Sequence, residues 1–311
     1  MRTLLGTGAT GSLVREVQCA LSARGLYSGV PDSVFGPVTS KGVQAFQQSQ
    51  RLGATGIVDN LTWPSLMHKP VPTVSDRSIQ LTSCFEGHGF GSGVGNFDGA
   101  LLTWGIVGFT LASGSIQSIV QSVYRTYPEK VRETFGNYTD ELMNLMTASR
   151  TDQTRWANDH TVGGRQLAEP WKTMFANFGA VPEVQQVQLK RVQRSYMQPA
   201  IQTAAKLGLA SELGLALCFD IHVQNGGVRP AAAAIISQMY DSGQPEDKLR
   251  TRLAQLVADS ASTQWRTDVL GRKMAIATGQ GNVHGRNYIL DNWGLNAQFP
   301  SFEVVAAAAA A

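Results

Sequence analysis

The chain has 311 residues, of which 43% are hydrophobic and 16% charged, with a formal net charge of +3. This composition excludes wholesale disorder and is typical of a globular chain with one large domain or two ordinary ones. The mild charge, without a dense Lys/Arg block, argues against a nucleic-acid partner, and no apolar run reaches the ~18 residues that would span a bilayer.

The first predicted unit is a small helical module over residues 9–67. Its apolar residues recur at helical spacing: Leu13, Val14, Val17 and Leu21 in a first helix, and Val43 and Phe46 in a second. Asp32 and Asp59 stand at equivalent positions of a degenerate internal repeat, each in a Gly-x-x-Asp setting. The pattern predicts a few short helices joined by turns.

Two motifs of this module resemble a known family. Residues 32–39 follow an Asp-x-x-Phe-Gly-x-x-Thr turn, and residues 43–47 read Val-x-x-Phe-Gln, as in the three-helix peptidoglycan-binding domain. The resemblance implies peptidoglycan as a partner. We expect Tyr27 and Gln47 to be exposed and to contact glycan, and the alternative is that such residues only build a small helical core.

Residues 68–77 are predicted to be a linker. Pro70 and Pro72 interrupt any helical period, and proline segments stay extended and semi-rigid. Ser75 or Asp76 is expected to cap the helix that follows.

The chemistry is predicted around Glu86 and Asp98, which stand twelve residues apart. Glycines alternate through residues 87–95 and cannot continue a helix, so a sharply turning loop is expected between the acids. Glu86 would end a helix, where an apolar setting and the macrodipole favour the protonated form that a general acid needs. Asp98, among glycines, would be wetter and ionised. Two carboxylates in unlike environments suit glycoside hydrolysis, although each residue could also be an ordinary solvated or turn residue.

Residues 98–110 resemble the active-site hairpin of the chitosanase family within the lysozyme-like superfamily. They contain Asp-Gly, a Thr five residues after the Asp, and Gly-x-x-Gly-Phe-Thr, and the upstream Phe85-Glu86 pair fits the family's acid. The resemblance implies Glu86 as acid, Asp98 as base and Thr103 as the hydroxyl that positions water. Trp104 is predicted to bind substrate. The Glu-to-Asp interval is shorter than in chitosanases, which leaves retention or inversion of the anomeric centre open.

The rest of residues 78–305 reads as a helical domain with no β pattern longer than the hairpin. Helices are expected at 114–124, 129–135, 141–148, 163–178, 184–207, 211–227, 246–261 and 262–278, with a kink or break at Pro199 and a polar glycine-rich loop at 279–288. The fold class is therefore mainly α: a small three-helix binding domain plus a larger lysozyme-like domain with a small β-hairpin.

Residues 211–227 predict a buried central helix that Gly226 ends. Its polar residues gather at or near the C-terminal end. Either Asp220 and His222 cap neighbouring helices or pair in the core, or His222, Gln224 and Asn225 line the sugar cleft.

The leading functional hypothesis is a muramidase-type cell-wall hydrolase, either an endolysin or a secreted antibacterial effector. A chitosanase, a lytic transglycosylase and a non-enzymatic wall-binding protein are the alternatives. We expect a monomer, no metal and no cofactor, and an immunity protein as a further partner if the chain is a toxin. No signal peptide is evident, so action in the periplasm or cell wall implies phage lysis or specialised secretion.

The three cysteines are too few for a disulfide framework. Free thiols are therefore expected, with a Cys84–Cys218 bridge as the alternative. The all-alanine tail, residues 306–311, is expected to lie outside the fold.

Overall fold

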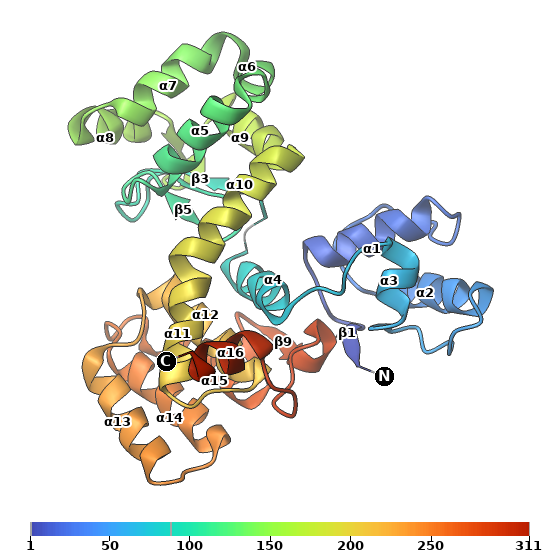
Figure 1. Cartoon of the computed structure of the whole chain (residues 1–311). Helices are drawn as coiled ribbons and strands as arrows, with labels where there is room; N and C mark the ends of the chain where they lie inside the picture. The colour runs from blue at the N-terminus through green and yellow to red at the C-terminus, as the bar shows by residue number, and fades with distance from the viewer. Residues whose placement is uncertain (1, 88, 311) are drawn as a thin grey trace. The chain divides into compact units, whose positions relative to one another are not determined.

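The computed structural model describes residues 2–87 and 89–310, which form two compact units (Figure 1). The first unit comprises the chain up to Phe85 and again from Tyr196 onward, and the second comprises Glu86–Ser195. The chain thus leaves the first unit and returns to it. The domains predicted from the sequence, residues 9–67 and 78–305 with a linker at 68–77, run consecutively instead, and their boundaries stay a prediction.

Helices dominate both units, so the mainly α class is confirmed. The first unit contains β1 (Thr3–Leu5), α1 (Ser12–Ser22), α2 (Pro37–Ser49), β2 (Val58–Asp59), α3 (Thr62–Met67), α4 (Val74–Glu86, whose last residue opens the second unit), α11 (Gln198–Lys206), α12 (Glu212–Asn225), α13 (Pro230–Asp241), α14 (Glu246–Asp259), α15 (Arg266–Thr278), β8 (Gln280–Val283), β9 (Arg286–Ile289), the 3₁₀ helix η3 (Leu290–Trp293) and α16 (Phe302–Ala309). The described strands occur in two- or three-stranded antiparallel sheets.

The predicted linker is largely structured. The Trp63 indole N–H donates to the Pro70 carbonyl (2.9 Å), and α4 begins at Val74, directly after Thr73. The Asp76 N–H donates to the Thr73 hydroxyl (3.1 Å), while the Asp76 carboxylate accepts from the Thr73 N–H (2.9 Å). This reciprocal pair is a capping box. Thr73 is therefore the cap, and the expectation of Ser75 or Asp76 was wrong by two or three residues.

The core of the first unit is built around α12. Every residue from Glu212 to Ile221 is buried, and α12 contacts α11, α14 and α15. α13 packs against α14 in turn, and Figure 1 shows these two helices together in orange. The predicted buried central helix is thus present, and Gly226 ends it in the left-handed conformation at φ 73°.

The end of the chain differs from the prediction. The glycine-rich stretch expected as a loop forms the hairpin β8–β9 with Asn282 opposite Asn287, and residues 306–309 belong to α16, which contacts α11. Ala311 lies outside the described residues. Cys84 and Cys218 are free thiols, as expected. No helix among the described residues is both long and apolar enough to cross a membrane.

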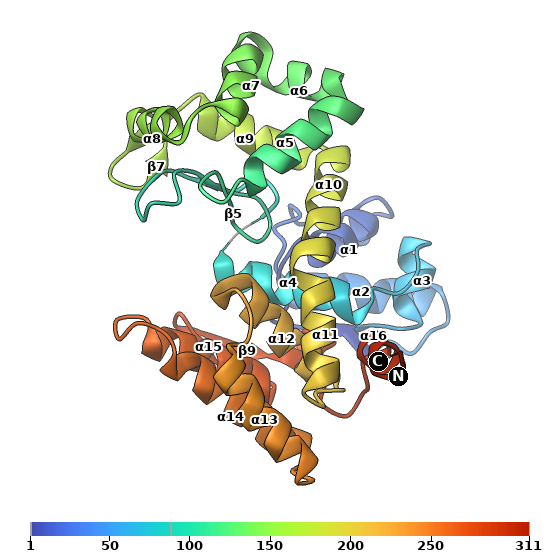
Figure 2. The same ribbon diagram turned by 60° about the vertical axis from the view of Figure 1, so that its left-hand side comes forward.

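The second unit combines helices with the short strands that carry Thr103. Its elements are β3 (Gly93–Val94), β4 (Thr103–Trp104), β5 (Phe109–Thr110), α5 (Ser115–Thr126), α6 (Pro128–Phe135), η1 (Gly136–Tyr138), α7 (Thr139–Thr147), α8 (Arg150–Asp159), β6 (Thr161–Val162), β7 (Gln166–Leu167), α9 (Trp171–Ala180), α10 (Pro182–Val192) and the π-helical η2 (Gln193–Met197). In Figure 2 the strands lie along one side of helices α5–α9. The helix expected at 163–178 is instead a hairpin followed by α9, because Gly163 and Gly164 both take positive φ and turn the chain.

The long helix expected at 184–207 is present as α10, η2 and α11. Proline lacks the N–H that would bond the carbonyl four residues earlier, and Pro199 is the second residue of α11. The wider π turn of η2 directly precedes it, and the division between the two units falls inside this π segment.

Candidate active site

Glu86 is the last residue of α4 and is half-buried, as the sequence predicted for a helix end. The residue before it, Phe85, is fixed by aromatic contacts. Its ring meets Tyr288 edge-on, with ring centroids 4.7 Å apart, and the Arg272 guanidinium lies 5.2 Å from its centroid. Directly after Glu86, Gly87 takes φ 65° and turns the chain away from the helix.

A buried ion cluster fixes the same helix one turn earlier. Asp220 of α12 is fully buried and accepts hydrogen bonds from Arg272 Nη2 (2.7 Å) and Lys273 Nζ (2.5 Å). Its Oδ1 also accepts from the Thr82 hydroxyl of α4 (2.9 Å). The carboxylate therefore ties α4, α12 and α15 together below Phe85.

The charges of this cluster decide its ionisation. Burial by itself raises the pKa of the Asp220 carboxyl, but attraction to Arg272 and Lys273 and the hydrogen bonds from both outweigh burial. The net pKa lies well below the usual range, so Asp220 stays ionised. Asp220 was expected either to cap a neighbouring helix or to pair in the core, and the structure shows that it pairs in the core.

Asp98 lies on the connection between β3 and β4, and its side chain is exposed as expected. Its Oδ1 accepts from the Ala100 N–H (3.0 Å), and Gly99 and Leu101 take positive φ at 87° and 67°. The carboxylate thus belongs to a tight Asx-type turn, with its remaining acceptor sites open to solvent.

Thr103 begins β4, the middle strand of the three-stranded sheet β3-β4-β5. It pairs with Val94 on one side and Thr110 on the other, and it is half-buried. Asp98 and Thr103 therefore belong to one hairpin, with the carboxylate in the turn and the hydroxyl at the start of the returning strand.

Trp104 was predicted to bind substrate, and this prediction was wrong. Its side chain has no exposed surface, its indole N–H donates to the Phe175 carbonyl (3.0 Å), and its ring stacks on Phe178 with centroids 5.6 Å apart. Side chains alternate across a strand, so the residue after the half-buried Thr103 points to the opposite face, into the core. Trp104 anchors β4 to α9.

The polar residues at the end of α12 have separate surroundings. His222 is half-buried, its Nε2 lies 2.9 Å from the Thr203 hydroxyl, and burial lowers its pKa. The Gln224 carbonyl accepts from Lys273 Nζ (2.6 Å), so this amide extends the ion cluster of Asp220. Neither residue has a surface fully open to a glycan.

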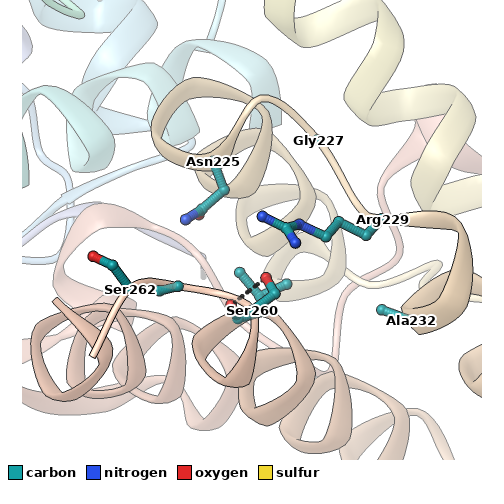
Figure 3. Close-up of a pocket in the computed structure, with 8 residues that line it drawn as sticks. Asn225, Gly227, Arg229, Ala232, Ser260 and Ser262 are labelled. Carbon is teal, nitrogen blue, oxygen red and sulfur yellow. Dashed lines mark hydrogen bonds between the residues drawn. The ribbon is translucent and has the colours of Figure 1, made fainter. Parts of the chain in front are cut away.

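Asn225 is exposed and lines a cavity of about 170 Å³ with Arg229, Ser260 and Ser262. Figure 3 shows the Arg229 guanidinium extending between Asn225 and Ser260. The cavity is smaller than the ~300 Å³ at which ligand pockets begin. It has room for a substituent of a sugar, and Asn225 as a glycan contact stays a prediction.

The N-terminal residues predicted to touch glycan are buried, so their expected exposure was wrong. Gln47 is fully buried: its amide nitrogen donates to the Ile57 carbonyl (2.8 Å) and the Thr62 hydroxyl (2.9 Å), and its carbonyl accepts from the Gly56 N–H (2.9 Å). Tyr27 is only 9% exposed. The alternative interpretation, that these residues build a small helical core, is the one that fits Gln47 and Tyr27.

The same arrangement recurs in the first half of the internal repeat. Gln18 is also fully buried, donating to Asp32 (2.7 Å) and Thr39 (3.1 Å) and accepting from the Ser33 N–H (3.0 Å). One buried glutamine in each half of the repeat therefore holds the adjacent turn by hydrogen bonds, so the internal repeat stabilises the fold of this module.

We expect Gln47→Leu to lower the free energy of unfolding by about 1–3 kcal/mol, because the Gly56 N–H and the Thr62 hydroxyl lose their buried partner. Urea denaturation of the full chain measures this. Gln44→Leu, on the more exposed side of the same helix, is the control. Equal stability of the Gln47 variant and the control would refute the structural role.

Several residues of this region escaped the sequence reasoning. The burial of Lys273 could not be predicted from the sequence, since a lysine in a helix is normally exposed. Phe97 and Arg165 were also missed, although Phe97 directly precedes Asp98. Within residues 2–87 and 89–310, no group of three or more His, Cys, Asp or Glu side chains could hold a metal ion.

A mainly α chain with a glutamate at the end of a helix, an aspartate in the β-hairpin that follows and a small N-terminal helical module has the features of a modular glycoside hydrolase of lysozyme-like fold. The model of glycosyl hydrolase family 46 matches residues 90–252, and that of a peptidoglycan binding domain matches residues 10–66. The chain belongs to glycosyl hydrolase family 46, and both resemblances seen in the sequence are confirmed. Glu86 lies four residues before the matched range.

Solved structures are similar at the level of the fold. A mutant chitosanase from Bacillus subtilis MY002, complexed with 6 GlcN, is 20% identical with a TM-score of 0.51, over 70% of this chain and 98% of that one. The Gynuella sunshinyii family 46 chitosanase with chitotetraose is 20% identical with a TM-score of 0.49, over 68% and 95%. No curated protein matches the chain.

Proposed function

We propose that this family 46 hydrolase cleaves β-1,4 glycosidic bonds of a hexosamine glycan, with Glu86 as general acid and Asp98 as base. The observation that supports this most is the contrast between a half-buried glutamate at the end of α4 and an exposed aspartate in the β3–β4 turn. These are the unlike environments that separate an acid from a base.

In this mechanism Glu86 donates its proton to the bridging oxygen, which leaves as the new hydroxyl of one sugar. A water molecule attacks the anomeric carbon from the opposite face and gives its proton to Asp98. The Thr103 hydroxyl, on the same hairpin as Asp98, would hold that water. Attack from the opposite face inverts the anomeric centre, which requires about 6.5–9.5 Å between the two carboxyl groups.

Chitosan, a polymer of glucosamine, is the first candidate substrate. Membership of family 46 supports it, together with the chitosanases of similar fold. The corresponding activity is endo-hydrolysis between glucosamine units.

Peptidoglycan is the second candidate, and the module matched at residues 10–66 supports it. Such a module would hold the enzyme on the wall and raise the local concentration of glycan. Asp98 is the only carboxylate of residues 87–128, which is sparse for a cleft that attracts cationic glucosamine. The enzyme would then be a muramidase acting in the periplasm or cell wall, as an endolysin or a secreted effector.

In the test, the full chain is incubated separately with chitosan oligomers and with purified sacculi. The products are then identified by mass spectrometry. Shorter glucosamine oligomers indicate a chitosanase, and new reducing-end MurNAc indicates a muramidase. Anhydro-MurNAc would reveal a lytic transglycosylase. Binding to sacculi without any product from either polymer would refute the proposal and leave a wall-binding protein.

We expect Asp98→Asn to lower kcat by about a hundred- to ten-thousandfold, because the amide cannot take the proton of the attacking water. Product release from the better of the two substrates measures this. The matched control is Asp140→Asn, an exposed acid in the first turn of α7. Activity of Asp98→Asn within threefold of the wild type would favour a transglycosylase, which needs one acid and no base.

A further inference from the structure

An exposed aromatic ring stands directly beside the proposed base. Phe97 precedes Asp98 in the chain, and its side chain is 48% exposed. A single exposed apolar side chain is ordinary by itself, so the significance of Phe97 depends on its neighbours. Sugar rings in particular pack their apolar faces on such rings.

A guanidinium group accompanies this ring. The Arg165 guanidinium carbon lies 4.6 Å from the Phe97 ring centroid, which is a cation–π contact. Arg165 belongs to the connection between β6 and β7, whose strands pair antiparallel. A second hairpin thus places a positive charge beside the loop that carries Asp98.

A backbone hydrogen bond joins the two loops, so the placement of Arg165 does not depend on its side chain alone. The Gly95 N–H donates to the Arg165 carbonyl (2.8 Å), and the Asn96 N–H donates to the Thr161 hydroxyl (2.8 Å). The Asn96 amide also donates to Asn158 (2.7 Å) and accepts from the Leu101 N–H (3.2 Å). Asn96 therefore connects both ends of the Asp98 turn to the neighbouring hairpin.

The charge of Arg165 is available to a ligand. Across residues 2–87 and 89–310, no carboxylate lies within ion-pair distance of its guanidinium. The side chain is exposed, and its five N–H donors suit a planar carboxylate. A glucosamine ammonium would instead meet a like charge here.

We infer that Phe97 and Arg165 form one wall of the sugar site beside Asp98 and select a hexosamine that bears a carboxylate, as muramic acid does. Phe97 packs against the sugar ring, and Arg165 binds the carboxylate in bidentate fashion. The inference rests on the proposed hydrolysis and names the substrate class of the same site. It favours peptidoglycan over chitosan.

The test compares three soluble substrates: a peptide-free tetrasaccharide of alternating GlcNAc and MurNAc, the same compound with its carboxyl groups amidated, and chitotetraose. We expect kcat/KM to fall about ten- to hundredfold on amidation, which is the worth of a charge-assisted hydrogen bond. Arg165→Gln should remove most of that difference by lowering kcat/KM on the acid substrate more than on the amide, and Arg165→Lys should restore part of it.

The control is Arg155→Gln, since Arg155 is an exposed residue of α8 that pairs with Asp152 (2.9 Å). It should keep the full preference for the acid. Equal cleavage of acid and amide by the wild type, or an equal loss on all substrates in Arg165→Gln, overturns the inference.

Binding separates this inference from the proposed hydrolysis. Calorimetry with the Glu86→Gln variant, with and without Arg165→Gln, measures affinity for the acid and the amide without turnover. If the wild type cleaves nothing, the hydrolysis proposal fails, yet a preference for the acid that depends on Arg165 still supports the wall. Equal affinities refute the wall whatever the activity.

Discussion

Glu86→Gln is expected to lower kcat on the preferred glycan by about a hundred- to ten-thousandfold, because the amide has no acidic proton for the leaving oxygen. The side chains are nearly the same size, so α4 and its capping box should persist. Product release measured over hours gives the rate, and circular dichroism checks the helix content.

The matched control is Glu133→Gln, an exposed glutamate of α6 that pairs with Lys130 (3.2 Å). It should keep wild-type activity. The Glu86 variant should also sediment with sacculi as the wild type does, because the module at residues 10–66 is unchanged. Activity of Glu86→Gln within tenfold of the wild type contradicts the role of this residue as the acid.

Many helices could be predicted from the sequence because the apolar residues of a helix recur at a fixed spacing over many residues. The near-continuous apolar run of α12 predicted a buried helix, and its residues 212–221 are all buried. The short strands were harder. Hairpins β6–β7 and β8–β9 have two and four residues per strand, too few for an alternating pattern to stand out.

The prediction of site residues failed where a sequence does not show which side chains are buried. Tryptophan and glutamine are residue types often found at glycan surfaces. Trp104 and Gln47 each donate a hydrogen bond to a backbone carbonyl inside the protein instead. Their burial depends on α9 and on the second half of the repeat, and no local pattern carries that information. Phe97 and Arg165 are brought together from distant parts of the chain, so only the fold could reveal the pair.

Asp220→Asn is expected to lower the free energy of unfolding by about 3–5 kcal/mol. Arg272 is 2% exposed and Lys273 has no exposed surface, so the substitution removes a carboxylate that two buried cations contact. Urea denaturation measures the loss. Thr82→Val, which removes only a neutral donor to Asp220, should cost about 1 kcal/mol and provides the graded control. Comparable losses in both variants would mean that charge is not what stabilises the cluster.

The same carboxylate makes stability depend on pH in a predictable direction. Because the pKa of Asp220 is lowered in the folded state, the unfolded chain binds more protons at low pH. The stability it contributes is fully present above the unfolded value of about 3.9 and is lost as pH falls toward the folded pKa. Wild-type stability should therefore decline more steeply below about pH 4 than that of Asp220→Asn. Parallel acid curves would show that Asp220 is not ionised in the native protein. Because the Thr82 hydroxyl of α4 donates to this carboxylate, protonation of Asp220 also alters a contact of the helix that ends at Glu86.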